Sequence, residues 1–283
     1  MNRMRVIGDE QLNHYVEAGI RQVQGWFGRV DAEIYRGVIT AQNEAGLGGA
    51  MAEIGVHHGK SFIAMCLGLQ DQDRAYCVDI FEDQHLNKDF SGMGSRIKLE
   101  ENLRRFGIAP EAVVITKSSS LDITAADILA AVGEVRFFSV DGGHWLEIVR
   151  NDLTIAEGCL AEHGVIAIDD FHRAEWPDVS AGYFAWHSAR TKPLVPFAIG
   201  SNKLYVCHQK WIDFYRERID NTPFLRSLKT KHSEFQGIEI PVFQSLLLPD
   251  ATVNTRFRRY MMTYHPEFYV RVKKYRSMIA RRR

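Results

Sequence analysis

The most constraining feature of the sequence is a strand–helix–strand pattern between Val135 and His172. An apolar run from Val135 to Val140 is followed by Asp-Gly-Gly-His, and another from Gly164 to Ile168 is followed by Asp-Asp-Phe-His. The segment between the two runs carries apolar residues at helical spacing. Because both runs are apolar throughout, the pattern predicts two parallel strands in a sheet that is covered on both faces.

Three acids and a histidine follow these two predicted strands. If the strands are neighbours, Asp141, Asp169 and Asp170 lie together at the carboxyl edge of the sheet, with His144 one turn away. Adjacent carboxylates repel one another unless a positive charge lies among them, and Mg²⁺ prefers oxygen ligands. The group therefore indicates a cation site, although each acid taken alone could be a helix cap or a solvated loop residue.

A second ligand-binding pattern follows the predicted strand Ala50–Ile54. It contains Glu53, Gly55 and Gly59 in the spacing E-x-G-x-x-x-G, and Ser61 begins the next predicted helix. A strand, a glycine turn and a helix N-terminus together commonly hold a nucleotide-type ligand. Alone the turn is a weak signal, because it is neither the GxGxxG dinucleotide pattern nor a phosphate-binding loop.

Two more strand ends carry polar residues. The second predicted strand ends at Asp79, 20 residues after Gly59, about where an acid receives the hydroxyls of a ribose. A helix cap or a loop acid is the alternative for Asp79. The third predicted strand, Ala112–Thr116, is followed by Lys117 and three serines that could meet a purine edge.

The chain of 283 residues suits one large α/β domain with additions at both ends. Predicted helices over 9–27 and 31–46 form an N-terminal cap (1–46), a core domain spans 47–210, and a C-terminal extension spans 211–283. The four cysteines of the chain are widely spaced. The sequence has no signal-peptide pattern and no apolar run of 18 residues. These observations predict a cytoplasmic protein without disulfides or a membrane span.

The C-terminal tail has a composition of its own. Residues 251–283 contain ten Arg or Lys against the single acid Glu267, so the tail carries +9 and residues 1–250 carry −9. A basic, aromatic segment of this kind could dock on the acidic remainder of the chain or on a partner subunit. It could also lie on an anionic membrane at its inner face, giving a peripheral association. The acidic remainder argues against nucleic acid as a partner.

Taken in order, the motifs resemble those of the class I S-adenosylmethionine-dependent methyltransferases. They are most similar to the metal-dependent sugar O-methyltransferases of macrolide and aminocoumarin antibiotic pathways, which are related to the cephalosporin-hydroxylase-like group. The resemblance covers roughly residues 30–210, and the D-G-G-H and D-D pair is its more specific part. It implies an α/β fold with a Rossmann-like, doubly wound and mostly parallel sheet. An antiparallel hairpin, N-terminal helices and a basic C-terminal helical extension complete the expected fold.

The resemblance also implies a role for each motif residue. Asp141, Asp169 and Asp170 would bind Mg²⁺ or another divalent cation, and His144 would be the general base. The residues expected to bind S-adenosyl-L-methionine are Glu53, Gly55, Gly59, Ser61, Asp79 and Ser119. The expected acceptor is a sugar hydroxyl of a small molecule or glycan, and the expected assembly is a homo-oligomer.

Three rival functions remain open on the sequence alone. A phenol or catechol chelates a cation as a vicinal diol does, so it could replace the sugar as acceptor. A metal-dependent hydrolase could use the same acid cluster without the cofactor. A regulatory protein could bind the cofactor without transferring its methyl group.

Overall fold

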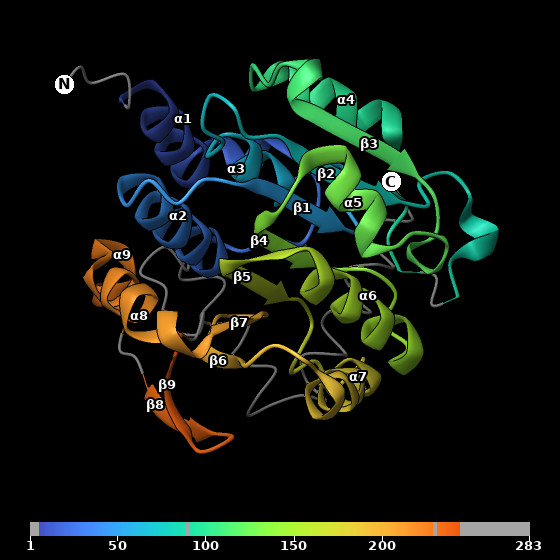
Figure 1. Ribbon diagram of the computed structural model, residues 1–283. Coiled ribbons are helices and arrows are strands. Elements are labelled where there is room, and N and C mark those ends of the chain that lie inside the picture. The colour runs from blue at the N-terminus through green and yellow to red at the C-terminus, as the bar shows by residue number, and fades with distance from the viewer. Residues whose placement is uncertain (1–5, 89–90, 229–230, 244–283) are drawn as a thin grey trace, which may run out of the picture. The chain divides into compact units, whose positions relative to one another are not determined.

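The computed structural model describes residues 6–88, 91–228 and 231–243, and one sheet organises them (Figure 1). The strands are β1 (Ala50–Ile54), β2 (Ala75–Asp79), β3 (Val113–Lys117), β4 (Val135–Val140), β5 (Leu160–Ile168), β6 (Leu194–Ile199), β7 (Leu204–His208), β8 (Lys231–Phe235) and β9 (Ile238–Val242). The α-helices are α1 (Val6–Glu17), α2 (Arg29–Glu44), α3 (Phe62–Cys66), α4 (Arg96–Arg105), α5 (Ala125–Val132), α6 (Leu146–Cys159), α7 (Pro177–Ala189), α8 (Ile212–Asn221) and α9 (Pro223–Ser227). Short 3₁₀ helices cover Gly19–Gln22, Gln84–Leu86, Pro110–Ala112, Ser120–Asp122 and Gln209–Trp211.

The strand order within the described residues is β3-β2-β1-β4-β5-β7-β6-β9-β8. The first five strands are parallel, and β7 then pairs antiparallel with β5 and forms a hairpin with β6. The two strands that the sequence predicted to be neighbours, β4 and β5, pair with Val140 opposite Ile168. The predicted α/β fold with a mostly parallel sheet and an antiparallel addition is therefore confirmed.

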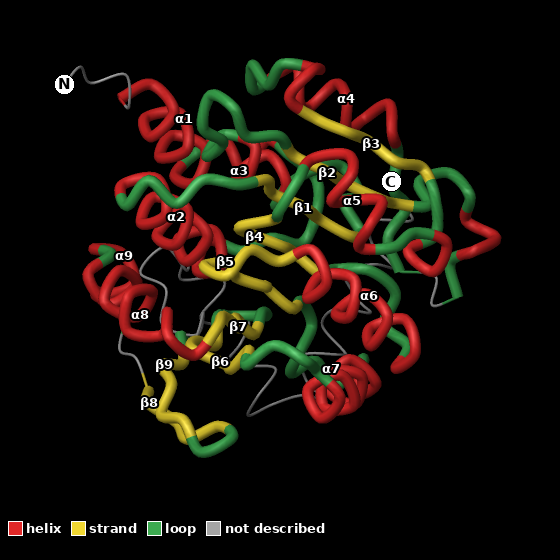
Figure 2. Tube along the Cα trace, in the orientation of Figure 1, coloured by secondary structure: helices red, strands yellow, loops and turns green. Residues whose placement is uncertain are grey.

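Helices cover both faces of the parallel part of the sheet (Figures 1 and 2). Phe138 and Val140 of β4 belong to a buried cluster that includes residues of α5, α6 and α7. Phe137 and Ser139 point to the opposite face, where both contact Tyr35 of α2. Because successive strand residues face opposite sides, a strand covered on both faces must be apolar nearly throughout, as the sequence of β4 is.

The N-terminal helix and the C-terminal strands differ most from the predicted elements. The helix predicted over 9–27 ends at Glu17 and is followed by a 3₁₀ turn. The apolar periodicity was misleading because Val23 and Phe27 are buried without being helical. Strand β8 was not predicted, since its residues are polar and mostly exposed. The apolar run Ile238–Leu248, which contains Pro241, predicts an edge strand or an extended arm, but β9 lies between β6 and β8.

The basic tail and the end of the predicted strand Ile238–Leu248 fall on residues 244–283, outside the described residues. The tail's membrane or docking role and the division into cap, core and extension stay predictions. Among the described helices, none combines the length and the apolar character that a membrane crossing needs.

Candidate active site

The carboxyl ends of the central parallel strands open into a cavity of about 540 Å³. This volume is typical of small-molecule sites, and open α/β sheets bind ligands at this edge. Most of the residues that the sequence singled out line the cavity: Gly55, Ser61, Asp79, Ser119, Asp141, His144, Asp169 and Asp170. Glu53 and Gly59 do not line it, so they can contribute only by shaping the glycine turn.

Gly55 brings two turns into direct backbone contact. Its φ is +82°, and a Cβ added there would lie 1.7 Å from the carbonyl oxygen of Asp141. The contact follows from the pairing of β1 with β4, which places Ile54 opposite Val140. Only a residue without a Cβ fits this position.

We expect Gly55→Ala to lower the free energy of unfolding by at least about 3 kcal/mol, because the methyl group would overlap a backbone oxygen. Urea unfolding followed by circular dichroism measures the change. Gly107→Ala is the matched control: Gly107 has a φ of +73°, but its added Cβ would meet nothing within 4 Å. Its cost should be only about 1–2 kcal/mol. Equal costs at the two positions would contradict the tight contact.

Glu53 supports the glycine turn from inside the protein. Its side chain is fully buried, and its Oε1 accepts a hydrogen bond of 2.6 Å from the Ser61 hydroxyl. Burial raises the pKa of Glu53 to about 7, although the bond from Ser61 opposes the shift. Glu53 therefore holds Ser61 at the cavity wall and does not itself reach the cavity.

Asp79 is held in place by two backbone N–H groups. Its Oδ2 accepts from His57 at 2.7 Å, and its Oδ1 accepts from Phe81 at 2.6 Å. Both donor residues have positive φ, +51° for His57 and +47° for Phe81, which is uncommon outside glycine. Burial raises the pKa of Asp79, and the two backbone bonds oppose that shift. Strained backbone is thus used here to fix one carboxylate at the cavity wall.

The remaining walls come from segments far apart in the sequence. Ser119 accepts the N–H of Leu121 at 3.2 Å and begins a 3₁₀ turn, so its hydroxyl is partly engaged in capping. On the other side, Trp26 lies 5.3 Å from the ring of His57, and Lys60 donates to the carbonyl of Gly25 at 2.9 Å. The segment before α2 therefore helps to enclose the glycine turn.

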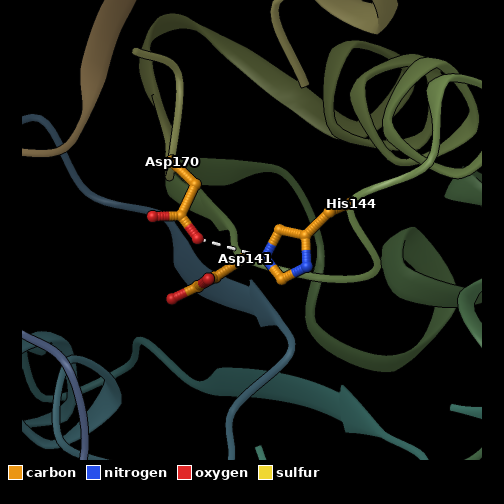
Figure 3. A group of neighbouring side chains, drawn as sticks. All are labelled: Asp141, His144 and Asp170. Atoms are coloured by element: carbon orange, nitrogen blue, oxygen red, sulfur yellow. Dashed lines mark ion pairs between the residues drawn. The ribbon is translucent and has the colours of Figure 1, made fainter. Parts of the chain in front are cut away.

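The structure brings Asp141, His144 and Asp170 together, with one potential ligand atom of each within 4.8 Å of the others (Figure 3). His144 Nε2 lies 3.1 Å from Asp170 Oδ2. The imidazole also stacks on Trp176, with ring centroids 4.3 Å apart and planes 13° from parallel. Asp170 has a φ of +52°, a left-handed conformation that is uncommon outside glycine but more frequent for Asp than for most residues.

Asp169 lies beside this group but directs its oxygens elsewhere. Its Oδ1 accepts from the Asn202 amide at 2.7 Å, and its Oδ2 lies 3.0 Å from the ammonium nitrogen of Lys203. Lys203 Nζ is also 3.5 Å from Asp141 Oδ2. A buried cation of the protein itself therefore already lies between Asp141 and Asp169.

The charges of this cluster determine its protonation. Burial alone would lower the pKa of Lys203, but the negative charges of Asp169 and Asp141 outweigh it and raise that pKa well above its usual value. Burial also opposes ionisation of Asp170, yet bonds from His144 and Asn202 outweigh it and lower the pKa of Asp170. Lys203 is consequently an ammonium and Asp170 a carboxylate at neutral pH.

Sequence reasoning missed Asn202 and Lys203. Both lie in the turn of the predicted β6–β7 hairpin, and the position of that hairpin decides their role. Because β7 pairs antiparallel with β5, with Leu204 opposite Ile168, the residue before Leu204 faces the residue after Ile168. A sequence reading that had paired the hairpin with β5 in this register would have placed Lys203 beside the acids at the end of β5.

Comparisons with known proteins agree with this geometry. A family model described as a methyltransferase domain matches residues 52–171, which contain all the predicted site residues. Among solved structures, the O-methyltransferase NovP is similar with a TM-score of 0.54 and 14% identity, over 65% of this chain and 83% of that one. No match was found among the curated proteins.

Two further solved structures are similar at lower scores. CalS11, a TDP-rhamnose 3'-O-methyltransferase of calicheamicin biosynthesis, has a TM-score of 0.47 and 14% identity, over 73% of this chain and 95% of that one. An O-methyltransferase from Bacillus cereus has a TM-score of 0.47 and 13% identity, over 70% and 89%.

The doubly wound sheet and the glycine turn at its carboxyl edge define an enzyme domain of the Rossmann-like class. The match over residues 52–171, from β1 to just beyond β5, shows that the chain contains a methyltransferase domain, and its fold is that of the O-methyltransferase NovP.

Proposed function

We propose that this methyltransferase transfers the methyl group of S-adenosylmethionine to a hydroxyl of a sugar, assisted by Mg²⁺ or another divalent cation. The observation that carries the proposal is the convergence of Asp141, His144 and Asp170 on the same cavity as the glycine turn and Asp79. A methyl donor and a polarised acceptor need to meet in one such cavity.

The cofactor side of the cavity suits a nucleoside with a charged amino-acid end. Gly55 lines the cavity with backbone alone, so a ligand there meets main-chain atoms. Asp79 would receive the ribose hydroxyls, because each carboxylate oxygen keeps a lone pair after accepting one backbone N–H. Ser119 would lie near the adenine.

We expect Asp79→Asn to weaken S-adenosylmethionine binding about 10- to 100-fold, as the loss of a charge-assisted hydrogen bond of roughly 1.5–3 kcal/mol implies. Asn keeps the size of the side chain but can accept only one of the two backbone N–H groups, from His57 or from Phe81, so circular dichroism and the melting temperature are measured beside the affinity. Isothermal titration calorimetry measures the affinity, and Asp83→Asn, in the loop just beyond β2, is the control. An unchanged affinity would rule out Asp79 as the ribose ligand.

The acceptor side offers donors of the kind that a hard cation prefers. Asp141 and Asp170 keep 26% and 15% of their side chains exposed toward the cavity, whereas Asp169 keeps 5%. Asp141 and Asp170 would therefore supply ligand oxygens, and Asp169 would add its charge to the site. A bound divalent cation would supply stabilisation of negative charge on the acceptor oxygen.

His144 would take the proton of the acceptor hydroxyl. Histidine can change its charge near neutral pH, and Asp170 at 3.1 Å orients the ring. Stacking on Trp176 fixes the plane of the imidazole. The sulfonium of the cofactor provides a reactive methyl group, so the protein mainly positions the acceptor and removes its proton.

A sugar acceptor is supported by the D-G-G-H and D-D resemblance and by the aromatic wall. Trp145 and Trp176 both line the cavity, and Trp145 keeps 47% of its surface exposed. The flat face of an indole can pack against the C–H face of a sugar ring while the hydroxyls turn to the acids. A catechol could use the same walls, so the acceptor has to be decided by experiment.

Mass spectrometry of acceptor mixtures tests the proposal. The purified full chain would be incubated with S-adenosylmethionine and nucleotide sugars, glycolipids, glycosylated natural products or catechols, with Mg²⁺ or with EDTA. We expect one added methylene on a glycosylated acceptor in the presence of Mg²⁺ alone. Full methyl transfer after exhaustive chelation would contradict the dependence on a divalent cation. Methylation of catechols alone would contradict the sugar acceptor.

A further inference from the structure

Lys203 is the buried cation that the sequence did not predict. Only 2% of its side chain is exposed, and its ammonium nitrogen lies 3.0 Å from Asp169 Oδ2 and 3.5 Å from Asp141 Oδ2. Neither contact has hydrogen-bond geometry, so the nitrogen is buried without a hydrogen-bond acceptor among the described residues. Its interaction with the acids is therefore a charge interaction aimed into the site.

The hairpin turn engages both oxygens of Asp169. Asn202 donates its amide to Asp169 Oδ1 at 2.7 Å and to Asp170 Oδ1 at 2.6 Å, while Lys203 faces Asp169 Oδ2. Asp170 Oδ2 remains directed at His144. Both oxygens of Asp169 are thus engaged by the hairpin turn, and Asp169 is the least exposed of the three acids.

The turn is fixed from the opposite side by helix α2. Buried Asp31 accepts hydrogen bonds from the Ser201 hydroxyl at 2.5 Å and from the Tyr205 hydroxyl at 2.8 Å. A Cβ added at Gly200 would lie 1.9 Å from Asp31 Oδ1, so the turn packs directly on this carboxylate. The backbone that carries Lys203 is therefore held against α2 on both sides of this residue.

The charges show what this arrangement does. Burial and the neighbouring Asp169 raise the pKa of Asp141 well above its usual value. A bound divalent cation would keep all three acids ionised, and three carboxylates with one ammonium then leave two negative charges for that cation to balance. An ammonium beside the site also repels an incoming cation, and in a partly buried site such repulsion is only weakly screened. Without Lys203 the cluster would carry a third negative charge and would offer Asp169 as a ligand.

We propose that Lys203 holds Asp169 out of the cation's ligand set and weakens the site's affinity for divalent ions, so that the cation binds through Asp141 and Asp170. The inference rests on the cation site of the proposed function and assigns Lys203 as a positioning residue.

Manganese binding tests this assignment without any measurement of activity. Free Mn²⁺ would be titrated by electron paramagnetic resonance in the wild-type protein, Lys203→Met, Asp169→Asn and the double variant. We expect Lys203→Met to bind Mn²⁺ at least about tenfold more tightly than wild type. The loss caused by Asp169→Asn should be at least about tenfold larger in the Lys203→Met background than in wild type. Lys210→Met removes an exposed lysine paired with Glu162 and should change nothing.

Thermal unfolding in EDTA gives a second readout. Lys203→Met should lower the melting temperature, because it leaves buried acids uncompensated, and adding Asp169→Asn should restore part of the loss. If Lys203→Met binds Mn²⁺ no more tightly than wild type, the inference is overturned while the cation site stands. Manganese binding to none of the proteins would overturn the cation site and the inference together. The expected manganese pattern without methyl transfer would support the inference and count against the proposed reaction.

Discussion

Asp170→Asn is expected to lower kcat/KM by about 10³-fold or more while the protein stays folded. The substitution removes one anionic ligand of the cation and the oxygen that orients His144 at 3.1 Å. The backbone should tolerate it, because Asn adopts the left-handed conformation of this position, with φ at +52°, as readily as Asp does. Steady-state kinetics with the accepted sugar at saturating Mg²⁺ measures the loss.

A matched control separates this effect from a general loss of charge. Asp220→Asn makes the same change at an exposed position of helix α8 and should leave kcat/KM within about twofold of wild type, as surface substitutions usually do. Circular dichroism and the melting temperature should match wild type for both variants. A folded Asp170→Asn protein with near-normal kcat/KM would exclude Asp170 as a ligand of the cation.

His144→Ala is expected to lower kcat by about 10²- to 10⁴-fold, the usual cost of removing a positioned proton acceptor. Cofactor affinity should change little, because the described contacts of His144 are to Asp170, Ser91 and Trp176 and not to the glycine turn. Calorimetry with S-adenosylmethionine and single-turnover kinetics separate the two quantities. The loss should shrink at high pH, where hydroxide can remove the proton.

His172→Ala is the informative comparison for the base. His172 follows the acid pair and packs edge-on against Phe171, with ring centroids 4.5 Å apart. The His172→Ala variant should retain most of the wild-type turnover if His144 is the base. A larger loss in His172→Ala than in His144→Ala would move the base to His172.

The sequence predicted the part of the site that depends on strand ends. An apolar run that stops at an acid fixes that acid at the edge of a parallel sheet, so Asp79, Asp141, Asp169 and Asp170 could all be placed on the cavity wall before the fold was known. Gly55 could be placed because a turn between a strand and a helix demands backbone freedom. These inferences need only local pattern and the geometry of a parallel sheet.

The rest of the site depends on packing between distant segments. The hydrogen bonds of Asp31 to Ser201 and Tyr205 join residues about 170 positions apart, and no local pattern announces them. The sequence predicts Lys203 only as the first residue of a hairpin strand, and its place beside Asp169 follows from the pairing of β7 with β5. Trp26 also could not be placed from its neighbours in sequence, because it lines the cavity through the path of the chain before α2.

The contact at Gly55 limits how such an enzyme can be retuned. Because the turn that would carry the methyl donor and the turn that would carry the acceptor's ligands meet backbone to backbone, no side chain lies between them whose exchange could lengthen or shorten the transfer distance. The distance between the bound methyl donor and the acceptor would therefore be set by the register between β1 and β4. New acceptors would therefore have to be accommodated at the mouth, through positions such as Trp145, while the spacing between donor and acceptor stays constant.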